Sequence, residues 1–466
     1  MSETYDITIV GAGPGGYVCA IRAAQLGLKV AIVEREHMGG ICLNWGCIPT
    51  KALLRSAEVY RNIKHANEFG FEVKGVTPDL DKIIQRSRKV SSKLSSGIGF
   101  LMKKNKVDVF DGQAELSKMN EVSVKQADGT VKKLTAKNVI IATGARAKTF
   151  PSLKVDGEII WTYKEALKPN KMPKSLLVVG SGAIGVEFAS FYNELGCDVT
   201  IVELKDKILP VEDADISDAA RKSFEAQGIA IHTSANVKKL EAKNGKAVAQ
   251  LVLGDGSTQT TEYDRAIVAV GIVGNIENLG LEKLGVKTEN GSIQTDEWGQ
   301  TNIKGVWAIG DVAGAPWLAH KASHEGTIVA ERIAAFDNVH PLNKTNIPGC
   351  TYGHPQVASV GLTEAAARAA GHNIKVGKFP FKGNGKAIAL GEVEGFIKTI
   401  VCADTAELLG AHMIGAEVTE LIQGYVIARD LEATTDELST TIFPHPTLSE
   451  MMHESVLDAE NRPLHI

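Results

Sequence analysis

Cysteine is scarce in this 466-residue chain, and its distribution excludes several classes of protein. Six scattered cysteines do not fit the dense disulfide framework of a small secreted domain. A zinc site would need more cysteine or histidine ligands at suitable spacing, and only His37 lies near the close pair Cys42 and Cys47. In a reducing compartment, such a pair is more often catalytic or metal-binding than structural. The six are Cys19, Cys42, Cys47, Cys197, Cys350 and Cys402.

Long apolar runs and clustered positive charge are also missing. No stretch approaches the roughly 20 apolar residues of a membrane span, and the N-terminus enters a strand-like Ile7 to Val10 without a basic or apolar leader. The formal net charge is −4, with no Lys and Arg stripe interleaved with aromatics, which argues against nucleic acid as a partner. We therefore expect a cytoplasmic, globular protein, and its length predicts three or four domains.

A dinucleotide-binding pattern opens the chain. Glycines in this pattern permit a tight turn and a close approach of the backbone to a pyrophosphate, which lies at the N-terminus of the following helix. A carboxylate about 20 residues further on binds ribose hydroxyls. Here a β-branched strand precedes the glycines, and a helical run to Gly27 leads to a second strand. The residues concerned are Gly11, Gly13, Gly16 and the strand-ending Glu34.

The same pattern returns later in the chain. Gly180, Gly182 and Gly185 follow an apolar strand over 176–179, and the next strand ends on Glu203. The sequence therefore predicts two bound dinucleotides. A carboxylate at Glu203 accepts a free 2′-hydroxyl and repels a 2′-phosphate, which favours NAD over NADP at the second site. A Rossmann-like domain without a ligand is the alternative.

The repeat extends beyond the glycines. Asp128-Gly129 and Asp255-Gly256 are both typical hairpin turns, and each is followed by a buried strand, ending at Thr143-Gly144 and at Gly271. The interval from Gly11 to Gly144 is 42 residues longer than that from Gly180 to Gly271, and the excess lies upstream of the hairpin. We expect an insertion there that carries the cysteine pair and a helix from about Lys51 to Phe69, beside the bound cofactor.

The cysteine pair requires an irregular backbone if it is to bridge. In a regular helix, residues five positions apart lie on different faces and roughly 7.5 Å apart along the axis, which is beyond the Cα reach of a disulfide. Asn44 and Gly46 tolerate turns, and Pro49 suits the first turn of a following helix. Two buried structural cysteines are the alternative interpretation.

The last third of the chain has a different character. Gly310-Asp311 follows a strand and places a carboxylate where a cofactor's sugar alcohol could be held, although a simple strand-turn explains it equally well. A helix is predicted to open at Ala319. Alternating strands and one amphipathic helix then indicate a separate α+β domain. The predicted strands are 351–360, 375–381, 396–401 and 408–414, and the helix is 418–429.

Together with a terminal His445-Pro-Thr-Leu-Ser-Glu450, these motifs resemble the pyridine nucleotide-disulfide oxidoreductases, and most closely the members that oxidise dihydrolipoamide. The resemblance covers essentially the whole chain. It implies an α/β fold of two Rossmann-like domains, with FAD on the first and NAD on the second, and a C-terminal α+β domain that forms a homodimer. The predicted domains are 1–149 for FAD, 150–274 for NAD, 275–345 as a central domain that completes the FAD site, and 346–466 for the dimer interface.

The resemblance also implies roles for individual residues. Cys42 would be the thiol that meets the substrate, and Cys47 its disulfide partner against the flavin. Lys51 would pair with Glu187 near the flavin; without the resemblance, it is an ordinary solvated lysine. His445, with Glu450, would serve as the base for Cys42 of the other subunit, because a His-carboxylate pair suits proton transfer near neutral pH. The expected cofactor contacts are Gly11, Gly13, Gly16, Glu34, Lys51, Thr143, Gly144, Gly310, Asp311, Ala319, Gly180, Gly182, Gly185, Glu187, Glu203 and Gly271.

The implied activity is oxidation of protein-bound dihydrolipoamide to lipoamide, with electrons passed through Cys42 and Cys47 and FAD to NAD+. A flavin is needed because a dithiol cannot pass hydride directly to NAD. The partner would be the separate lipoyl domain of a 2-oxoacid dehydrogenase complex or glycine cleavage system.

Three rival functions remain. An NADPH-dependent reductase of a small disulfide would need basic residues in place of Glu203. A mercuric reductase would need a terminal cysteine pair. A non-catalytic FAD- and NAD-binding scaffold or redox sensor would not need Cys42, Cys47, His445 and Glu450 together. The chain departs from the family at Ile41, Trp45 and Thr50, and it lacks the family's arginine after Gly271, so a nucleotide contact from that arginine is not assured.

Overall fold

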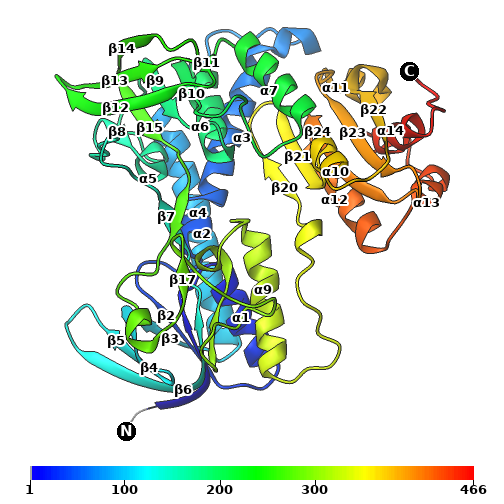
Figure 1. Ribbon diagram of the computed structural model, residues 1–466. Helices are drawn as coiled ribbons and strands as arrows, with labels where there is room; N and C mark the ends of the chain where they lie inside the picture. The colour runs from blue at the N-terminus through cyan, green and yellow to red at the C-terminus, as the bar shows by residue number, and fades with distance from the viewer. Residues whose placement is uncertain (1–2) are drawn as a thin grey trace. The chain divides into compact units, whose positions relative to one another are not determined.

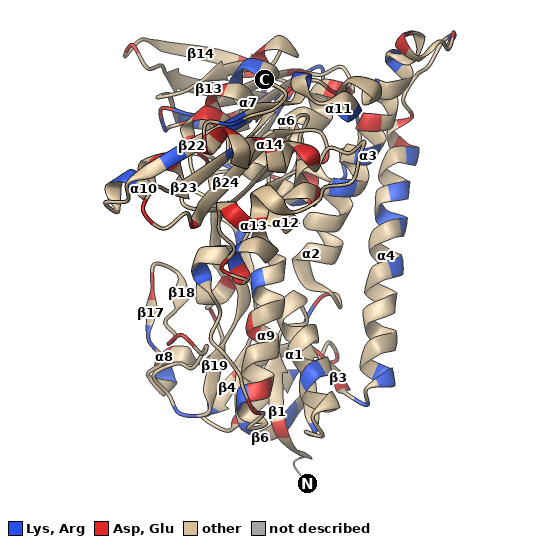
Figure 2. Ribbon diagram, turned by 90° about the vertical axis from the view of Figure 1, so that its right-hand side faces the viewer, with Lys and Arg blue, Asp and Glu red and all other residues tan. Residues whose placement is uncertain are grey.

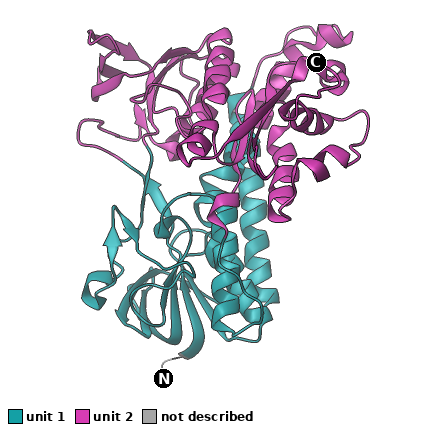
Figure 3. Ribbon diagram, turned by 45° about the vertical axis from the view of Figure 1, so that its right-hand side comes forward, with its two compact units in different colours: residues 1–53, 79–148, 271–342 teal, residues 54–78, 149–270, 343–466 magenta. Residues whose placement is uncertain are grey.

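The computed structural model describes residues 3–466. It forms two compact units (Figures 1 and 3). Unit 1 comprises residues up to 53, 79–148 and 271–342, and unit 2 comprises 54–78, 149–270 and 343–466. The four predicted domain boundaries stay a prediction. Among the described residues, no helix is both long and apolar enough to cross a bilayer.

Unit 1 is built on a parallel sheet of five strands. β1 (Glu3–Val10) lies between β2 (Val30–Glu34) and β6 (Val131–Ile141), with Ile7 opposite Val30 on one side and Asn138 on the other. β3 (Asp108–Asp111) extends the sheet beyond β2, and β19 (Val306–Ala308) extends it beyond β6. Residues 7–10, 30–33 and 139–141 of the middle strands are buried because both faces of the sheet are covered there. This is the Rossmann arrangement, with the carboxyl ends of the strands along one edge.

An antiparallel meander joins this sheet. β4 (Gln113–Lys118) pairs with β5 (Glu121–Lys125), which pairs with the first half of β6. The predicted hairpin lies between β5 and β6: Gly129 has φ +85°, and Asp128 accepts a hydrogen bond from the Thr130 amide at 2.9 Å. The prediction of a turn at Asp128-Gly129 is confirmed.

Helices cover the sheet of unit 1. α1 (Pro14–Gln25) packs on α9 (Ala319–Ile333), and α4 (Leu80–Lys104) begins at Asp79, whose side chain caps the Lys82 amide. α4 buries Ser87, Ser91, Ile98 and Met102 at helical spacing, and Lys and Arg recur along its length (Figure 2). The shorter elements are β7 (Ala145–Ala147), β16 (Ile272–Gly274), α8 (Leu281–Leu284), β17 (Thr288–Glu289), β18 (Ser292–Ile293) and the 3₁₀ turn η2 (Gly310–Ala313).

The helix observed in the insertion differs from the predicted helix at both ends. α3 (Cys47–Lys64) starts at the second cysteine, and a separate 3₁₀ turn, η1 (Ala66–Phe69), follows it. Pro49 lies in the first turn of α3, where a missing amide hydrogen leaves no intrahelical bond unmade. The helix therefore begins before Pro49 rather than after it.

The nucleotide-binding part of unit 2 repeats the design of unit 1. Its parallel sheet has the order β11, β10, β9, β15, β8, and an antiparallel meander runs through β12, β13 and β14. Only α7 connects β10 to β11, whereas α2, α3, η1 and α4 connect β2 to β3. The predicted repeat and insertion are confirmed. The elements are α5 (Tyr163–Ala166), α6 (Ala183–Glu194), α7 (Ala214–Ala226), β8 (Ile160–Trp161), β9 (Ser175–Val179), β10 (Asp198–Val202), β11 (Ala230–His232), β12 (Asn236–Lys243), β13 (Lys246–Val252), β14 (Thr258–Tyr263) and β15 (Arg265–Val268).

The C-terminal part of unit 2 is an antiparallel sheet with helices packed against it. The strand order is β20, β21, β24, β23, β22, and α12 and α14 share one apolar core with the sheet. The predicted strand over 351–360 is interrupted, because the strand stops before the turn that contains Pro355, which has no amide hydrogen to donate. The bounds are β20 (Gly349–Thr351), β21 (Gln356–Gly361), β22 (Ile374–Pro380), β23 (Phe396–Cys402), β24 (Leu408–Gly415), η3 (Lys344–Asn346), η4 (Phe381–Gly383), α10 (Glu364–Ala369), α11 (Gly385–Leu390), α12 (Val418–Asp430), α13 (Thr435–Thr440) and α14 (Glu450–Ala459).

Candidate functional site

The cysteine pair lies where two helices meet at a break. α2 (Gly40–Asn44) ends before Trp45, whose φ of −139° leaves the helical region, and α3 begins at Cys47. A hydrogen bond joins the Cys42 and Cys47 side chains. A continuous helix would hold residues at this spacing apart. The irregular backbone predicted between the two cysteines is confirmed.

Two glycines fasten this segment to the first glycine loop. The Gly39 amide donates to the Ala12 carbonyl at 2.8 Å, and Gly39 and Gly40 have φ values of 88° and 58°. A Cβ on Gly40 would come within 2.7 Å of the Gly13 Cα, so the contact excludes any side chain. The dithiol segment therefore lies directly beside the loop predicted to bind the first nucleotide.

Asn44 holds this segment through its side chain. It is the buried last residue of α2, and its Nδ2 donates to the carbonyls of Met38 and Gly40 at 3.0 and 2.9 Å. α4 supports the same segment, because Arg88 donates to the Asn44 carbonyl at 2.6 Å and the Ser95 hydroxyl to that of Met38 at 2.7 Å. Asn44 itself stays helical, and the break falls at Trp45, between the two turn-tolerant residues Asn44 and Gly46.

The surroundings of Cys42 favour the protonated form of its thiol. The pKa of the Cys42 thiol is raised, first by its hydrogen bond to Cys47 and then by burial, while Lys51 opposes the shift. Burial, followed by the two sulfurs, also raises the pKa of the Tyr17 hydroxyl. Cys42 is therefore a poor nucleophile on its own, and a separate proton acceptor is needed when a thiol at this site reacts.

The first glycine loop has the shape of a dinucleotide site. Gly11 has φ +104°, and a Cβ there would come within 2.3 Å of the Ala142 carbonyl oxygen. A Cβ on Gly16 would come within 1.9 Å of the Gly11 carbonyl oxygen, whereas Gly13 faces open space. α1 begins after Gly13 with no side-chain cap, so its first amides are available to an anion. Glu34 accepts from the Ala12 amide at 2.8 Å.

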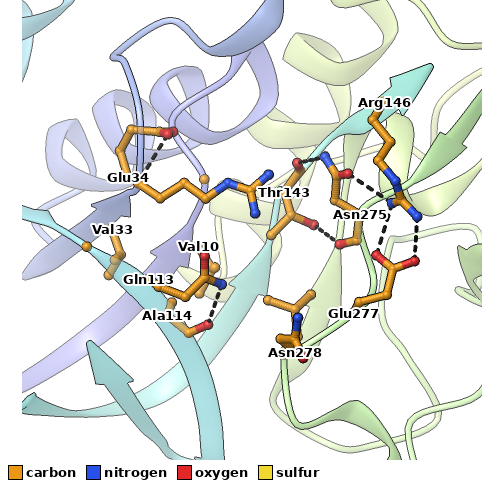
Figure 4. Close-up of a pocket in the computed structure, with 14 residues that line it drawn as sticks. Val10, Val33, Glu34, Gln113, Ala114, Thr143, Arg146, Asn275, Glu277 and Asn278 are labelled. Atoms are coloured by element: carbon orange, nitrogen blue, oxygen red, sulfur yellow. Dashed lines mark hydrogen bonds and ion pairs between the residues drawn. The ribbon is translucent and has the colours of Figure 1, made fainter. Parts of the chain in front are cut away.

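A cavity of about 340 Å³ adjoins this loop at the carboxyl edge of the sheet (Figure 4). Arg146 closes one wall with a two-pronged ion pair to Glu277, at 2.9 and 2.6 Å. Thr143 and Asn275 exchange hydrogen bonds at 2.8 and 2.9 Å beside it. These shapes fit the adenosine half of a dinucleotide such as FAD. The lining residues are Val10, Gly11, Val33, Glu34, Arg35, Gly112, Gln113, Ala114, Thr143, Arg146, Asn275, Glu277, Asn278 and Leu279.

Asp311, whose carboxylate is predicted to hold a sugar alcohol of the first cofactor, also belongs to unit 1. Burial raises the pKa of its carboxyl group, Lys321 opposes this, and Glu325 adds to it. Lys321 is 3% exposed and pairs with Glu325 at 3.0 Å, and Glu325 also accepts from the Gly310 amide at 2.7 Å. Lys321 and Glu325 were not predicted. Their four-residue spacing at the start of α9, just after Ala319, is the sequence feature that indicates an ion pair on one face of the helix.

The second glycine loop has the same geometry as the first. A Cβ on Gly180 would come within 2.5 Å of the Ala269 carbonyl oxygen, one on Gly185 within 2.1 Å of the Gly180 carbonyl oxygen, and Gly182 faces open space. α6 also starts without a side-chain cap. Glu203, which is buried, accepts from the Ser181 amide at 2.8 Å and its hydroxyl at 2.7 Å. The loop therefore fits a second dinucleotide.

His445 and Glu450 form the predicted pair. His445 Nδ1 lies 2.9 Å from Glu450 Oε1, and the imidazole is 78% exposed. Burial opposes ionisation of Glu450, but the Thr447 amide and His445 outweigh it and lower its pKa. An ionised carboxylate on Nδ1 leaves Nε2 as the nitrogen that takes up a proton.

Three other histidines have structural contacts. His412 is buried against the Leu362 carbonyl at 2.9 Å, and His453 contacts the Ser439 carbonyl at 2.9 Å. His465 pairs with Glu454 at 2.7 Å.

Two predicted pairings join residues of different units. Lys51 and Cys42 belong to unit 1, whereas Glu187 and His445 belong to unit 2. Within unit 2, Glu187 is 5% exposed and accepts from the Tyr352 amide at 3.0 Å. The pairings of Lys51 with Glu187 and of Cys42 with His445 stay predictions. Within residues 3–466, no group of three or more His, Cys, Asp or Glu side chains is arranged to hold a metal ion.

Comparison with known proteins agrees with this geometry. Residues 5–326 match the family model described as pyridine nucleotide-disulphide oxidoreductase. The chain belongs to this family. Residues 347–456 match the dimerisation domain of the pyridine nucleotide-disulphide oxidoreductases.

Full-length relatives and solved structures narrow the comparison. The chain is 58% identical to a dihydrolipoyl dehydrogenase of Rhizobium etli and 57% identical to one of Zymomonas mobilis, with 100% of both chains covered in each case. Among solved family members, LpdA from Mycobacterium tuberculosis superposes with a TM-score of 0.90 at 27% identity, covering 97% of this chain and 99% of that one. The flavoprotein disulfide reductase RclA from Escherichia coli gives 0.88 at 26% identity, covering 98% and 99%.

Proposed function

We propose that this chain oxidises protein-bound dihydrolipoamide to lipoamide and passes the electrons through the Cys42 and Cys47 pair and FAD to NAD+. The observation that carries the proposal is the fastening of the dithiol segment onto the first glycine loop through the Gly39 amide and the Ala12 carbonyl. This contact holds a redox-active pair beside the site for a flavin dinucleotide. Identity of 57–58% to the two dihydrolipoyl dehydrogenases over the full length supports the substrate.

The residues of unit 1 would hold FAD. Gly11, Gly13 and Gly16 provide the pyrophosphate turn, and Glu34 binds ribose. Lys51, Thr143, Gly144, Gly310, Asp311 and Ala319 complete the proposed contacts. When bound, FAD accepts the electron pair from the dithiol and delivers it to NAD+ as hydride.

The residues of unit 2 would hold NAD+. Gly180, Gly182 and Gly185 form the turn, and Glu203 accepts the free 2′-hydroxyl. Glu187 and Gly271 are the further proposed contacts. The carboxylate of Glu203 disfavours NADPH, and this is the reason to prefer the proposed reaction to the reduction of a small disulfide by NADPH.

In the proposed exchange, the electrons that the substrate dithiol loses all pass to the Cys42-Cys47 disulfide. One substrate thiolate attacks Cys42 Sγ of the Cys42-Cys47 disulfide, forming a mixed disulfide and releasing Cys47 as a thiolate. The second substrate thiol attacks the substrate sulfur bound to Cys42 and closes the lipoamide ring. Its proton passes to the departing Cys42 sulfur, which leaves as a thiol. The substrate thus loses two electrons and two protons, and the cysteine pair gains the electrons. His445, held by Glu450, takes up the first proton.

The proposal includes a homodimer in which His445 serves Cys42 of the other subunit. The matched dimerisation domain supports the dimer. Chains carrying Cys42→Ser can be mixed with chains carrying His445→Gln. If the base acts across the interface, mixed dimers regain one complete site, and activity returns. If each subunit uses its own base, both sites stay incomplete and the mixture stays inactive.

The activity itself is tested by an anaerobic titration. Dihydrolipoamide should reduce the enzyme and produce long-wavelength absorption from a thiolate beside the flavin, and NAD+ should reverse the change. Faster turnover of NADPH with oxidised glutathione than of dihydrolipoamide with NAD+ would refute the assignment.

A pull-down that identifies the lipoylated partner decides among the 2-oxoacid dehydrogenase complexes and the glycine cleavage system. A cytoplasmic location is part of the proposal, and cell fractionation tests it.

A further inference from the structure

A buried lysine in the C-terminal sheet of unit 2 is surrounded by carboxylates. Lys398 of β23 is 2% exposed, and its Nζ lies 2.8 Å from Asp213 Oδ1. The same nitrogen lies 3.0 Å from Asp215 Oδ2 and 2.8 Å from Glu364 Oε2. Asp213 is also 2% exposed. Asp213 and Asp215 come from the nucleotide-binding part, so this cluster joins that part to the C-terminal sheet.

The cluster is held in its charged form. Burial disfavours the ammonium, but the hydrogen bonds to the carboxylates outweigh it and raise the pKa of Lys398. Burial opposes ionisation of Asp213 as well, and Lys398 and the Glu364 amide lower its pKa in spite of it. A buried ion pair of this kind depends on geometry, because removal of one partner leaves the other charged and unsolvated.

Asp213 is the last residue of an irregular segment, 203–213, that begins at Glu203. Its side chain caps α7 by accepting from the Asp215 amide at 3.1 Å, and its other oxygen accepts from the Glu364 amide at 2.9 Å. Residues 203–213 contain no helix or strand. The position of this segment is therefore set by its two ends and by the contacts it makes between them.

The middle of the segment contacts the second glycine loop. The Leu209 amide donates to the Ser181 carbonyl at 3.1 Å, and the Ser217 hydroxyl of α7 donates to the Leu209 carbonyl at 3.2 Å. From its other side, Ser181 donates its amide and hydroxyl to Glu203. Ser181 lies between Gly180 and Gly182, so residues 203–213 hold the nucleotide loop on both sides.

We propose that Lys398 is a positioning residue for the NAD site. By fixing Asp213, it fixes the far end of segment 203–213, and through Leu209 and Glu203 it fixes the glycine loop. Without this anchor, the segment gains conformational freedom that the nucleotide must remove on binding. The inference rests on the proposed function only in taking NAD as the nucleotide bound at Gly180 to Gly185.

The test compares charge removal at Lys398 with the same change elsewhere in the sheet. Lys398→Met keeps the length of the apolar stem, and Lys398→Arg restores the charge. Lys375→Met is the control, because Lys375 on β22 of the same sheet forms an ion pair with Glu460 of the C-terminal part, at 2.7 Å. ADP-ribose is the probe, titrated by calorimetry into the FAD-loaded enzyme, because it contacts the glycine loop and Glu203 without undergoing reaction.

The expected result is a rise in the ADP-ribose Kd of about tenfold or more for Lys398→Met, partial recovery for Lys398→Arg and no change for Lys375→Met. The KM for NAD+ should rise with it, while the KM for dihydrolipoamide and anaerobic reduction by dihydrolipoamide stay within about twofold. A merely structural role would shift both substrates together. An ADP-ribose Kd within twofold of wild type in folded Lys398→Met would overturn the proposal.

A second variant covers the case in which Lys398→Met does not fold. Asp213→Asn keeps the shape of the side chain and a cap acceptor for α7 but removes the charge that Lys398 binds. Faster amide exchange over 203–213 and weaker ADP-ribose binding should accompany this change; wild-type values for both would overturn the proposal. Because ADP-ribose binding needs no turnover, failure to oxidise dihydrolipoamide would refute the proposed function and leave this test unaffected.

Discussion

Replacing His445 by glutamine removes the proposed base while keeping a polar side chain of similar reach. Glutamine can still approach Glu450, which His445 Nδ1 contacts at 2.9 Å, but it has no basic nitrogen. Glu450 itself keeps a second contact, because its other oxygen accepts from the Thr447 amide at 2.8 Å. Within its own subunit the imidazole is 78% exposed, so its loss removes little packing there. The substitution therefore separates proton transfer from folding.

The expected size of the effect follows from the role of a general base. Positioned proton transfer contributes typically 10²–10⁴-fold to a rate, which corresponds to about 3–5 kcal/mol of activation free energy. Oxidation of dihydrolipoamide by NAD+ should fall by this factor. Electron transfer from NADH to an artificial acceptor does not use the thiol base, and it should stay within about threefold of wild type. Thermal stability should change by less than about 0.5 kcal/mol, as for other exposed sites.

The chain provides a matched control for this substitution. His465 also pairs with a glutamate, Glu454, at 2.7 Å, and is 68% exposed. His465→Gln therefore removes a similarly exposed imidazole from its glutamate and should leave both activities unchanged. Stopped-flow reduction of each variant by dihydrolipoamide isolates the thiol step. Equal loss of both activities in His445→Gln, or no loss in the thiol step, would remove His445 from the role of base.

Three further predictions follow from the geometry. Cys47→Ser should abolish dihydrolipoamide oxidation with FAD retained, whereas loss of the flavin, read by absorbance, would show that Cys47 holds the cofactor rather than reacts. Gly40→Ala places a Cβ 2.7 Å from the Gly13 Cα, at a backbone φ of +58°. It should therefore lower the free energy of unfolding by about 1–3 kcal/mol and lower the FAD content. Gly97→Ala, whose Cβ would have no contact within 4 Å outside its own helix, is the control in thermal melts. The pKa of Asp213 is lower in the folded state, so its contribution to stability is complete above the unfolded pKa of about 4 and is lost as pH falls through the folded value. Acid titrations of unfolding should show this loss in wild type and not in Asp213→Asn.

Much of the fold could be predicted because it depends on short-range rules. The glycines at Gly11 and Gly180 have positive φ because the chain turns sharply after a buried strand. The turns at Gly129 and Gly256 likewise identify two meanders. Comparing the two repeats then located the insertion, because the same architecture with extra residues must accommodate them between two known strands. The strands β22, β23 and β24 and the helix α12 followed from their hydrophobic patterns, whereas the strand predicted over 351–360 is interrupted.

The local form of the dithiol segment was only partly predictable. The spacing of Cys42 and Cys47 required a break, but its position at Trp45 depends on Asn44, whose side chain binds two carbonyls and keeps α2 helical to its end. Propensity favours a turn at asparagine. At Asn44 the side chain instead donates to the Met38 and Gly40 carbonyls, and the residue stays in the helix.

The sequence by itself determined which residue types could carry the chemistry: two glycine loops with their acids, a close cysteine pair and a terminal His-Glu. Only the tertiary structure decided what surrounds them. The pair Arg146 and Glu277 that closes the first cavity lies 131 positions apart, and Lys398 meets Asp213 across 185 positions. No local pattern encodes such contacts, because only the packing of the chain brings residues so far apart in the sequence together.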